Sequence, residues 1–137
     1  MIQKPIFSPQ VEWLPPTDFP DLSKYNEIAI DLETKDLELK NMGSGSVTGR
    51  GQIVGIAVAV RDWSGYYPVA HEGGGNMDKS MVMKWFQDAL NTEATKIFHN
   101  AMYDVCFIKA AGLKISGKIV DTMIAGSLVD ENRFRYD

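Results

Sequence analysis

Residues 28–34 of this 137-residue chain read IAIDLET, and this stretch decides the fold. Side chains along a β-strand alternate between its two faces, so the isoleucines and the leucine can fill a core while Asp31 and Glu33 share the opposite face. Two neighbouring carboxylates repel each other unless a cation or solvent relieves the repulsion. Taken alone, the pattern therefore predicts either a divalent-metal site or a strand whose polar face lies in water.

The composition is that of an ordinary soluble protein. The length fits one domain, and 45% of the residues are hydrophobic, which is enough for a globular core. The sequence shows neither an apolar run that could cross a bilayer nor a secretory signal, and its single cysteine, Cys106, has apolar neighbours typical of a reduced, buried thiol. We therefore expect a cytoplasmic protein that contacts no membrane. The net charge of −4 argues against a broad basic surface for duplex DNA, but it permits a site for a few nucleotides at one strand end.

The order of the expected elements predicts the fold class. Five prolines in residues 1–24 predict an extended segment that lies over the domain, and the domain itself is expected at residues 25–137. The glycine-rich residues 41–52 predict a mobile loop. Strands are expected at residues 27–33, 53–61, 65–70 and 96–99, and helices at 79–91, 101–111 and from 121 or 122 to 129. This order, β-β-β-α-β-α followed by a last helix, predicts an α/β fold with a mixed sheet and flanking helices.

Three details refine these elements. The second and third strands are expected to form a hairpin across residues 62–64. Asp78 is a good N-cap for the first helix, whose apolar face is expected to include Met81 together with Trp85. Gly112 is expected to end the second helix.

A third carboxylate is expected near the first pair. Residues 98–104 turn from a strand into a helix, with Asn100 suited to the cap and Asp104 in the first turn. Sites in α/β proteins usually lie where strand ends meet helix starts, so Asp104 can face Asp31 and Glu33 across one cleft.

Together these motifs resemble a known family. D-x-E-T at residues 31–34, N-x-x-x-D at 100–104, Asp121-Thr122 at a helix start and YYPVAH at 66–71 are similar to the proofreading 3′-5′ exonuclease domain of family A DNA polymerases, which are polymerase I-like and include phage enzymes. That domain belongs to the DnaQ-like, or DEDD, superfamily. The resemblance implies a ribonuclease H-like fold and hydrolysis of the 3′-terminal phosphodiester of single-stranded DNA in a bacterium or an infected host cell.

The resemblance also implies a metal site. Two divalent ions, Mg²⁺ or Mn²⁺, would lie about 4 Å apart, one activating water and the other stabilising the leaving oxygen. By this resemblance Asp31 would bind both ions, Glu33 the ion on the nucleophile side, and Asp104 the second ion. Such a site needs charge neutralisation more than a protein nucleophile.

Substrate contacts follow from the same resemblance, each with a simpler alternative. Thr34 would contact the terminal nucleotide, Leu37 would wedge beside its base, and Asn100 and Tyr103 would line the strand. Leu37 and Tyr103 are also explained as packing residues, and Asn100 as a helix cap. His71 is expected to be a hydrogen-bonded structural histidine, and Asp121 a helix cap rather than a ligand.

The family pattern is incomplete in this sequence. A fourth carboxylate, in a Y-x-x-x-D or H-x-x-x-x-D motif, does not follow Asp121, so we expect a truncated domain with weak or absent activity, and a polymerase domain further along the same longer chain. In a second register His99 would be the general base of an H-x-A-x-x-D motif, with Asp78 or Asp88 as the missing aspartate. Two other functions stay open: a non-catalytic nucleic-acid-binding or structural module, and a ribonuclease D-type RNA exonuclease.

Overall fold

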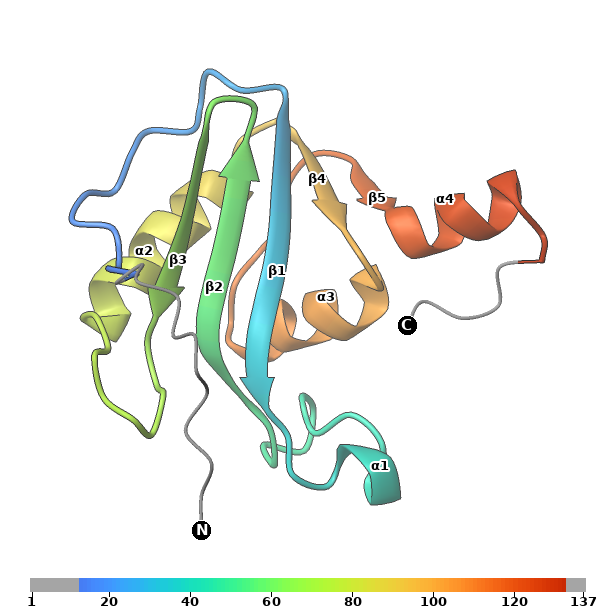
Figure 1. Ribbon diagram of the computed structural model, residues 1–137, viewed down its shortest axis with the longest axis horizontal. Helices are drawn as coiled ribbons and strands as arrows, with labels where there is room; N and C mark the ends of the chain where they lie inside the picture. The colour runs from blue at the N-terminus through green and yellow to red at the C-terminus, as the bar shows by residue number, and fades with distance from the viewer. Residues whose placement is uncertain (1–12, 133–137) are drawn as a thin grey trace, which may run out of the picture.

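A computed structural model describes residues 13–132, which form a five-stranded sheet with helices packed against it (Figure 1). The strands are β1 (Glu27–Lys35), β2 (Gln52–Val60), β3 (Trp63–Pro68), β4 (Thr95–Phe98) and β5 (Ile119–Asp121). The helices are α1 (Leu39–Met42), α2 (Lys79–Leu90), α3 (Ala101–Ala110) and α4 (Thr122–Val129).

The sheet is mixed, as predicted. Its strand order is β3-β2-β1-β4-β5, with β1 antiparallel to β2 and parallel to β4. β2 and β3 form an antiparallel hairpin, and β5 adds parallel to β4 after the crossover through α3. This arrangement confirms the expected α/β, ribonuclease H-like sheet and places β1 at its centre.

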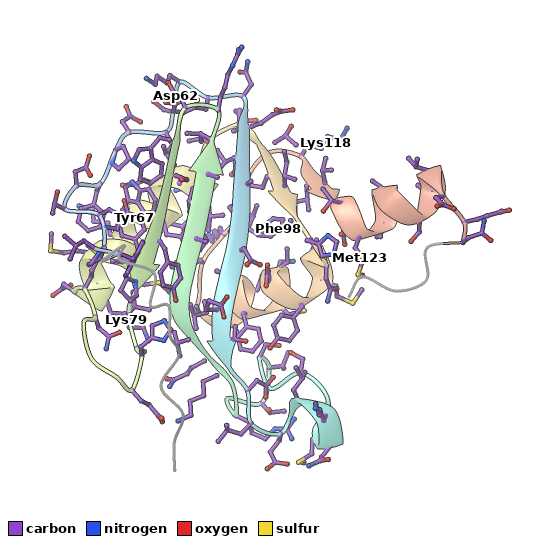
Figure 2. The ribbon with its side chains drawn as sticks, viewed as in Figure 1. Asp62, Tyr67, Lys79, Phe98, Lys118 and Met123 are labelled. Atoms are coloured by element: carbon purple, nitrogen blue, oxygen red, sulfur yellow. The ribbon has the colours of Figure 1, made fainter. Side chains whose placement is uncertain are left out.

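The core lies on one face of the sheet. Figure 1 shows α2 and α3 behind the strands, and the side chains of β1 that point toward them are buried: Ile28, Ile30 and Leu32 are 0%, 3% and 6% exposed. Tyr67 and Phe98, labelled in Figure 2, are buried in the same core. The alternation predicted for residues 28–34 is therefore confirmed, and the two acidic side chains lie on the face that these helices leave uncovered.

The N-terminal segment lies against this core over its described part. Phe19 stacks on Tyr67 with ring centroids 5.5 Å apart, and the indole N–H of Trp85 donates to the carbonyl of Pro20 at 2.8 Å. Leu22 is buried among the same side chains. Residues 13–24 thus lie over the domain as expected, while residues 1–12 fall outside the described residues.

Two short elements differ from the prediction. α1 has four residues and β5 has three, too few for either to show a hydrophobic period in the sequence. β5 forms because β4 offers its outer edge for parallel pairing from Lys96 to Phe98. The β2–β3 turn is also tighter than expected, since Val60 pairs with Trp63 and only two residues lie between them.

Two burial predictions are wrong. Met81 is 57% exposed, because the buried stripe of α2 begins one residue later at Val82. Cys106 is only partly buried in α3. The boundaries of the helices themselves agree with the prediction: the Asp78 carboxylate accepts the Met81 N–H at 2.9 Å, and Gly112 ends α3 with a φ of 81°.

Two surface features complete the description. The glycine-rich residues 43–51 form a loop, which is fastened to the end of β1 by the Gly45 N–H donating to Asp36 at 2.7 Å. α4 has no buried residue, and its Leu128 and Val129 are 82% and 89% exposed. No helix within residues 13–132 is both long and apolar enough to cross a membrane.

Candidate active site

β1 presents Asp31 and Glu33 on the uncovered face of the sheet. Their cross-strand partners on β2 are Ala57 and Gly55, which have the smallest side chains available. No long side chain of β2 therefore covers the two carboxylates, and both are exposed to solvent. The surface hollow that contains Asp31 has a floor of small residues and is bordered by Tyr66 and His99.

Asp104 reaches the same place from α3. β4 pairs with β1 only from Glu27 to Ala29, and beyond that point the backbone of Leu32 forms a hydrogen bond with the Asp104 carboxylate. The side chain of Asp104 is 4% exposed, and its Oδ2 has no hydrogen-bond partner among residues 13–132. A buried carboxylate oxygen without a partner is costly, which makes Asp104 the most unusual polar group in the core.

The three carboxylates interact electrostatically. The pKa of Asp104 is raised to about 7: burial is the largest cause, the charge of Asp31 also raises it, the Leu32 backbone hydrogen bond lowers it, and Glu33 adds a smaller upward effect. In the absence of a cation, a substantial fraction of Asp104 is therefore protonated at neutral pH. Asp31 and Glu33 thus lie close enough to Asp104 to affect its pKa, while the joint binding of an ion by the three carboxylates stays a prediction.

The donor set is suitable for a hard divalent ion. Carboxylate oxygens are the preferred ligands of Mg²⁺ and Mn²⁺, and a cation here would neutralise the mutual repulsion and supply a partner for the Asp104 Oδ2. Within residues 13–132, no three side chains of His, Cys, Asp or Glu are already arranged to ligate one ion. Asp31 and Glu33 are exposed, so both side chains have room to change rotamer.

Thr34 and Tyr103 lie together beside the carboxylates. The Thr34 Oγ1 and the Tyr103 hydroxyl are 2.8 Å apart and share a hydrogen bond. The Tyr103 ring also packs on Phe107 with centroids 5.0 Å apart. Tyr103 therefore has a packing role, and its hydroxyl still stands at the edge of the site.

The capping role expected for Asn100 is wrong. Its backbone is left-handed, with φ 66° and ψ 58°, and its side chain makes no capping hydrogen bond. The Asp121 carboxylate instead accepts the N–H groups of Asn100 and Ala101 at 3.0 and 2.9 Å, and also that of Met123 at 2.9 Å. Asp121 is thus the cap predicted from the sequence, but it serves the starts of both α3 and α4. The Asn100 side chain is exposed, and its backbone conformation is one that asparagine tolerates better than most residues.

Leu37 is not a packing residue. It is 79% exposed just beyond the end of β1 and lines a surface hollow with Thr34, Lys35 and His71. An apolar side chain this exposed at the end of the central strand is available to contact a flat apolar group such as a base.

The sequence reasoning missed Tyr66. It stands on the uncovered face of β3, in register with Ala57 and through it with Asp31, and its hydroxyl is hydrogen-bonded to His71 Nε2. Burial, followed by the charge of Glu33, raises the pKa of Tyr66. The structural role predicted for His71 is confirmed. Two sequence signals pointed to Tyr66: the YYPVAH tract at residues 66–71, and Gly55, since a glycine inside a strand often marks the close approach of another group.

The second register, with His99 as a general base, lacks its aspartate. The His99 Nδ1 lies 2.9 Å from the Thr122 hydroxyl. Asp78 caps α2, and Asp88 lines a hollow with Phe19 and Trp85 that includes no residue of β1 or α3. Neither aspartate is beside Asp31.

Comparison with known sequences identifies the family. The family model of the 3′-5′ exonuclease domain of family A DNA polymerases matches residues 19–137. A DNA-directed DNA polymerase of Pseudomonas phage M6 is 31% identical over 145 residues, which cover 98% of this chain and 22% of that protein. DNA polymerase I of Borreliella burgdorferi is 28% identical over 112 residues, covering 81% of this chain and 11% of that protein. The chain thus spans 22% and 11% of the length of these two relatives.

Solved structures support the fold. Brucella melitensis NrnC with bound Mg²⁺ superposes with a TM-score of 0.55 at 21% identity, covering 84% of this chain and 50% of that chain. The exonuclease domain of Aedes aegypti Nibbler superposes with a TM-score of 0.55 at 15% identity, covering 85% of this chain and 51% of that chain. At these identities the likeness concerns the fold alone.

Proposed function

Because this chain belongs to the 3′-5′ exonuclease domain family of polymerase I-like DNA polymerases, we propose that Asp31, Glu33 and Asp104 bind divalent metal ions and that the domain hydrolyses the 3′-terminal phosphodiester of single-stranded DNA. The relatives are much longer DNA polymerases, so the proposal includes a polymerase domain in the same longer polypeptide. In this proposal residues 25–137 belong to the exonuclease domain, and residues 1–24 form an N-terminal extension.

The main support for the proposal comes from the buried carboxyl group of Asp104. Its buried carboxyl has an oxygen without a partner and a pKa of about 7, and two of the groups that raise the pKa are Asp31 and Glu33. A structural carboxylate would be expected to have its oxygens satisfied. A cation bound near Asp104 and its two acidic neighbours would relieve both the cost of burying this charge and the repulsion among the three carboxylates.

The proposed chemistry divides between ions and protein. When bound, two Mg²⁺ or Mn²⁺ ions would supply a hydroxide nucleophile and charge neutralisation at the leaving oxygen. The protein supplies the rigid placement: β1 fixes Asp31 and Glu33 on one face, and α3 fixes Asp104 behind the gap between β1 and β4. The DEDD resemblance also calls for a fourth carboxylate, which stays a prediction outside the described residues.

The terminal nucleotide would lie beside the metal residues. The Thr34–Tyr103 hydroxyl pair can hydrogen-bond to the sugar or phosphate, and the exposed Leu37 can contact the base. Asn100, with its side chain not used for capping, can line the strand. These contacts are local, as fits a chain with a net charge of −4 that holds a strand end rather than a long duplex.

The test compares cleavage of a 5′-labelled single-stranded oligonucleotide in Mg²⁺ by the chain, by Asp31→Asn and by Asp88→Asn. Asp88 is an exposed acidic residue of α2 outside the site and serves as the matched control. Because the fourth carboxylate does not follow Asp121, we expect at most slow stepwise shortening from the 3′ end, which Asp31→Asn abolishes and Asp88→Asn leaves unchanged. Cleavage that survives Asp31→Asn overturns the proposal, and preference for an RNA strand of the same sequence would select a ribonuclease D-type activity.

A parallel measurement does not depend on turnover. Binding of Mn²⁺ to the folded state should raise the melting temperature, with a stabilisation of about 2.7 kcal/mol at a hundred times the dissociation constant. Asp31→Asn should remove this rise. No Mn²⁺-linked rise in the unaltered chain would identify a non-catalytic module instead.

A further inference from the structure

The ring of Tyr66 fills space that a side chain at Gly55 of β2 would otherwise occupy. Gly55 is the cross-strand partner of Glu33, and a Cβ added to Gly55 would collide with the hydroxyl oxygen of Tyr66. The phenol ring of Tyr66 therefore leans over Gly55, toward the strand that carries Glu33. Because cross-strand partners project from the same face of a sheet, the Tyr66 hydroxyl and the Glu33 carboxylate share one side of β1 and β2.

The hydroxyl is held in this position from the loop after β3. His71 Nε2 forms a hydrogen bond with the Tyr66 hydroxyl, and the rings meet nearly edge to face with centroids 5.9 Å apart. His71 is itself fixed by Asn76, whose Oδ1 accepts the His71 N–H at 2.7 Å and whose Nδ2 donates to the His71 carbonyl at 2.8 Å. The next residue, Glu72, forms an ion pair with Lys35 at the end of β1. Loop residues 71–76 are thus fastened at both ends despite their three glycines.

The charge of Glu33 favours one direction for the Tyr66–His71 hydrogen bond. A carboxylate only accepts hydrogen bonds, so a phenol hydrogen that points toward Glu33 is favoured. In that case the phenol oxygen accepts from His71, which then carries its hydrogen on Nε2. Glu33 raises the pKa of Tyr66, after the larger effect of burial, which agrees with a neutral phenol close to that charge.

We propose that Tyr66, held by His71, is a positioning residue that orients the Glu33 carboxylate for metal binding. The inference rests on the proposed function, in which Glu33 is a metal ligand. Residues that hydrogen-bond to metal ligands restrict their orientation, and losing such a contact usually weakens metal affinity about 10- to 100-fold.

The test is Mn²⁺ affinity measured by titration calorimetry on the unaltered chain, Tyr66→Phe and His71→Gln. Tyr66→Phe keeps the ring and removes only the hydroxyl, and we expect it to weaken Mn²⁺ binding by about 10-fold. Tyr67→Phe is the matched control: its hydroxyl donates to the Asp18 carbonyl at 2.9 Å in the core, so its loss should lower the melting temperature without changing Mn²⁺ affinity.

Two double variants test whether Tyr66 acts together with His71 and on Glu33. Adding His71→Gln to Tyr66→Phe should cause no further loss if His71 acts through Tyr66. Tyr66→Phe should also have no effect in a Glu33→Gln background, since there is then no charged carboxylate to orient. Equal affinity of Tyr66→Phe and the unaltered chain, or an undiminished effect in the Glu33→Gln background, overturns the inference. Mn²⁺ affinity that Asp31→Asn leaves unchanged overturns the proposed function itself, so the two failures are distinct.

Discussion

Replacing Asp104 with asparagine should stabilise the metal-free protein at alkaline pH. The folded protein holds the Asp104 carboxyl at a pKa of about 7, against an ordinary value of 3.8. With the pKa raised on folding, the folded state binds the proton more tightly than the unfolded state does. The favourable contribution of the protonated carboxyl is therefore fully present below about pH 3.8 and is lost as the pH rises through about 7.

The size of this loss can be bounded. The difference between 7 and 3.8, at about 1.4 kcal/mol per pKa unit, gives an upper limit of roughly 4 kcal/mol. Asp31 and Glu33 are exposed and salt screens their charges, so we expect about half of that limit, roughly 2 kcal/mol. Asparagine has nearly the same shape as aspartic acid and stays neutral at every pH, so Asp104→Asn should not suffer the loss.

The assay is urea unfolding with a chelator present, at about pH 5 and about pH 8. Asp104→Asn should be more stable than the unaltered chain by roughly 2 kcal/mol at the higher pH, and by less than about 1 kcal/mol at the lower. Asp88→Asn should differ at neither pH. Asp104→Asn that is equally stable or less stable at the higher pH would refute the reasoning, because the buried carboxyl would then carry no electrostatic cost.

Three further predictions concern the frame of the site. Asp121→Ala removes the hydrogen-bond acceptor at the starts of α3 and α4 and should lower the free energy of unfolding in urea by about 2 kcal/mol. Burial by itself would raise the pKa of Asp121, but the backbone hydrogen bonds that it accepts outweigh burial and lower this pKa. The stabilising contribution of Asp121 is therefore present above about pH 3.8 and is lost as the pH falls through the lower pKa of the folded state. Lys96→Met should lower the free energy of unfolding by about 1–3 kcal/mol, because the wholly buried ammonium of Lys96 donates to two backbone carbonyls that would lose their partner. The urea concentration at the midpoint of unfolding would measure this loss. Gly55→Ala should displace the Tyr66 hydroxyl and weaken Mn²⁺ binding as much as Tyr66→Phe does, which titration calorimetry would show.

The sequence was sufficient for the parts of the site that lie on regular elements. Alternation in residues 28–34 predicts which face of β1 is buried, and the strand-to-helix junction predicts that Asp104 lies near the acidic pair, whose charges affect its pKa. Both features depend on local periodicity, which a single strand or helix carries in its own residues.

Features that depend on contacts between distant segments could not be predicted in this way. The cap of α3 comes from Asp121 rather than from Asn100, because β5 brings a carboxylate from a distant part of the chain to the helix start. The Tyr66–His71 pair depends on a strand side chain meeting a loop side chain, which neither the YYPVAH tract nor Gly55 specifies by itself. The full exposure of Leu37 follows from where β1 ends, which its apolar character does not reveal.

The central claim is that Asp31, Glu33 and Asp104 together hold divalent metal. Crystals of the chain soaked in Mn²⁺ and measured at the manganese absorption edge would locate the ion directly. We expect an anomalous peak within coordination distance of all three carboxylates, and its loss in crystals of Asp31→Asn. A peak elsewhere, or one that persists unchanged without the Asp31 carboxylate, would show that these three residues do not form the metal site.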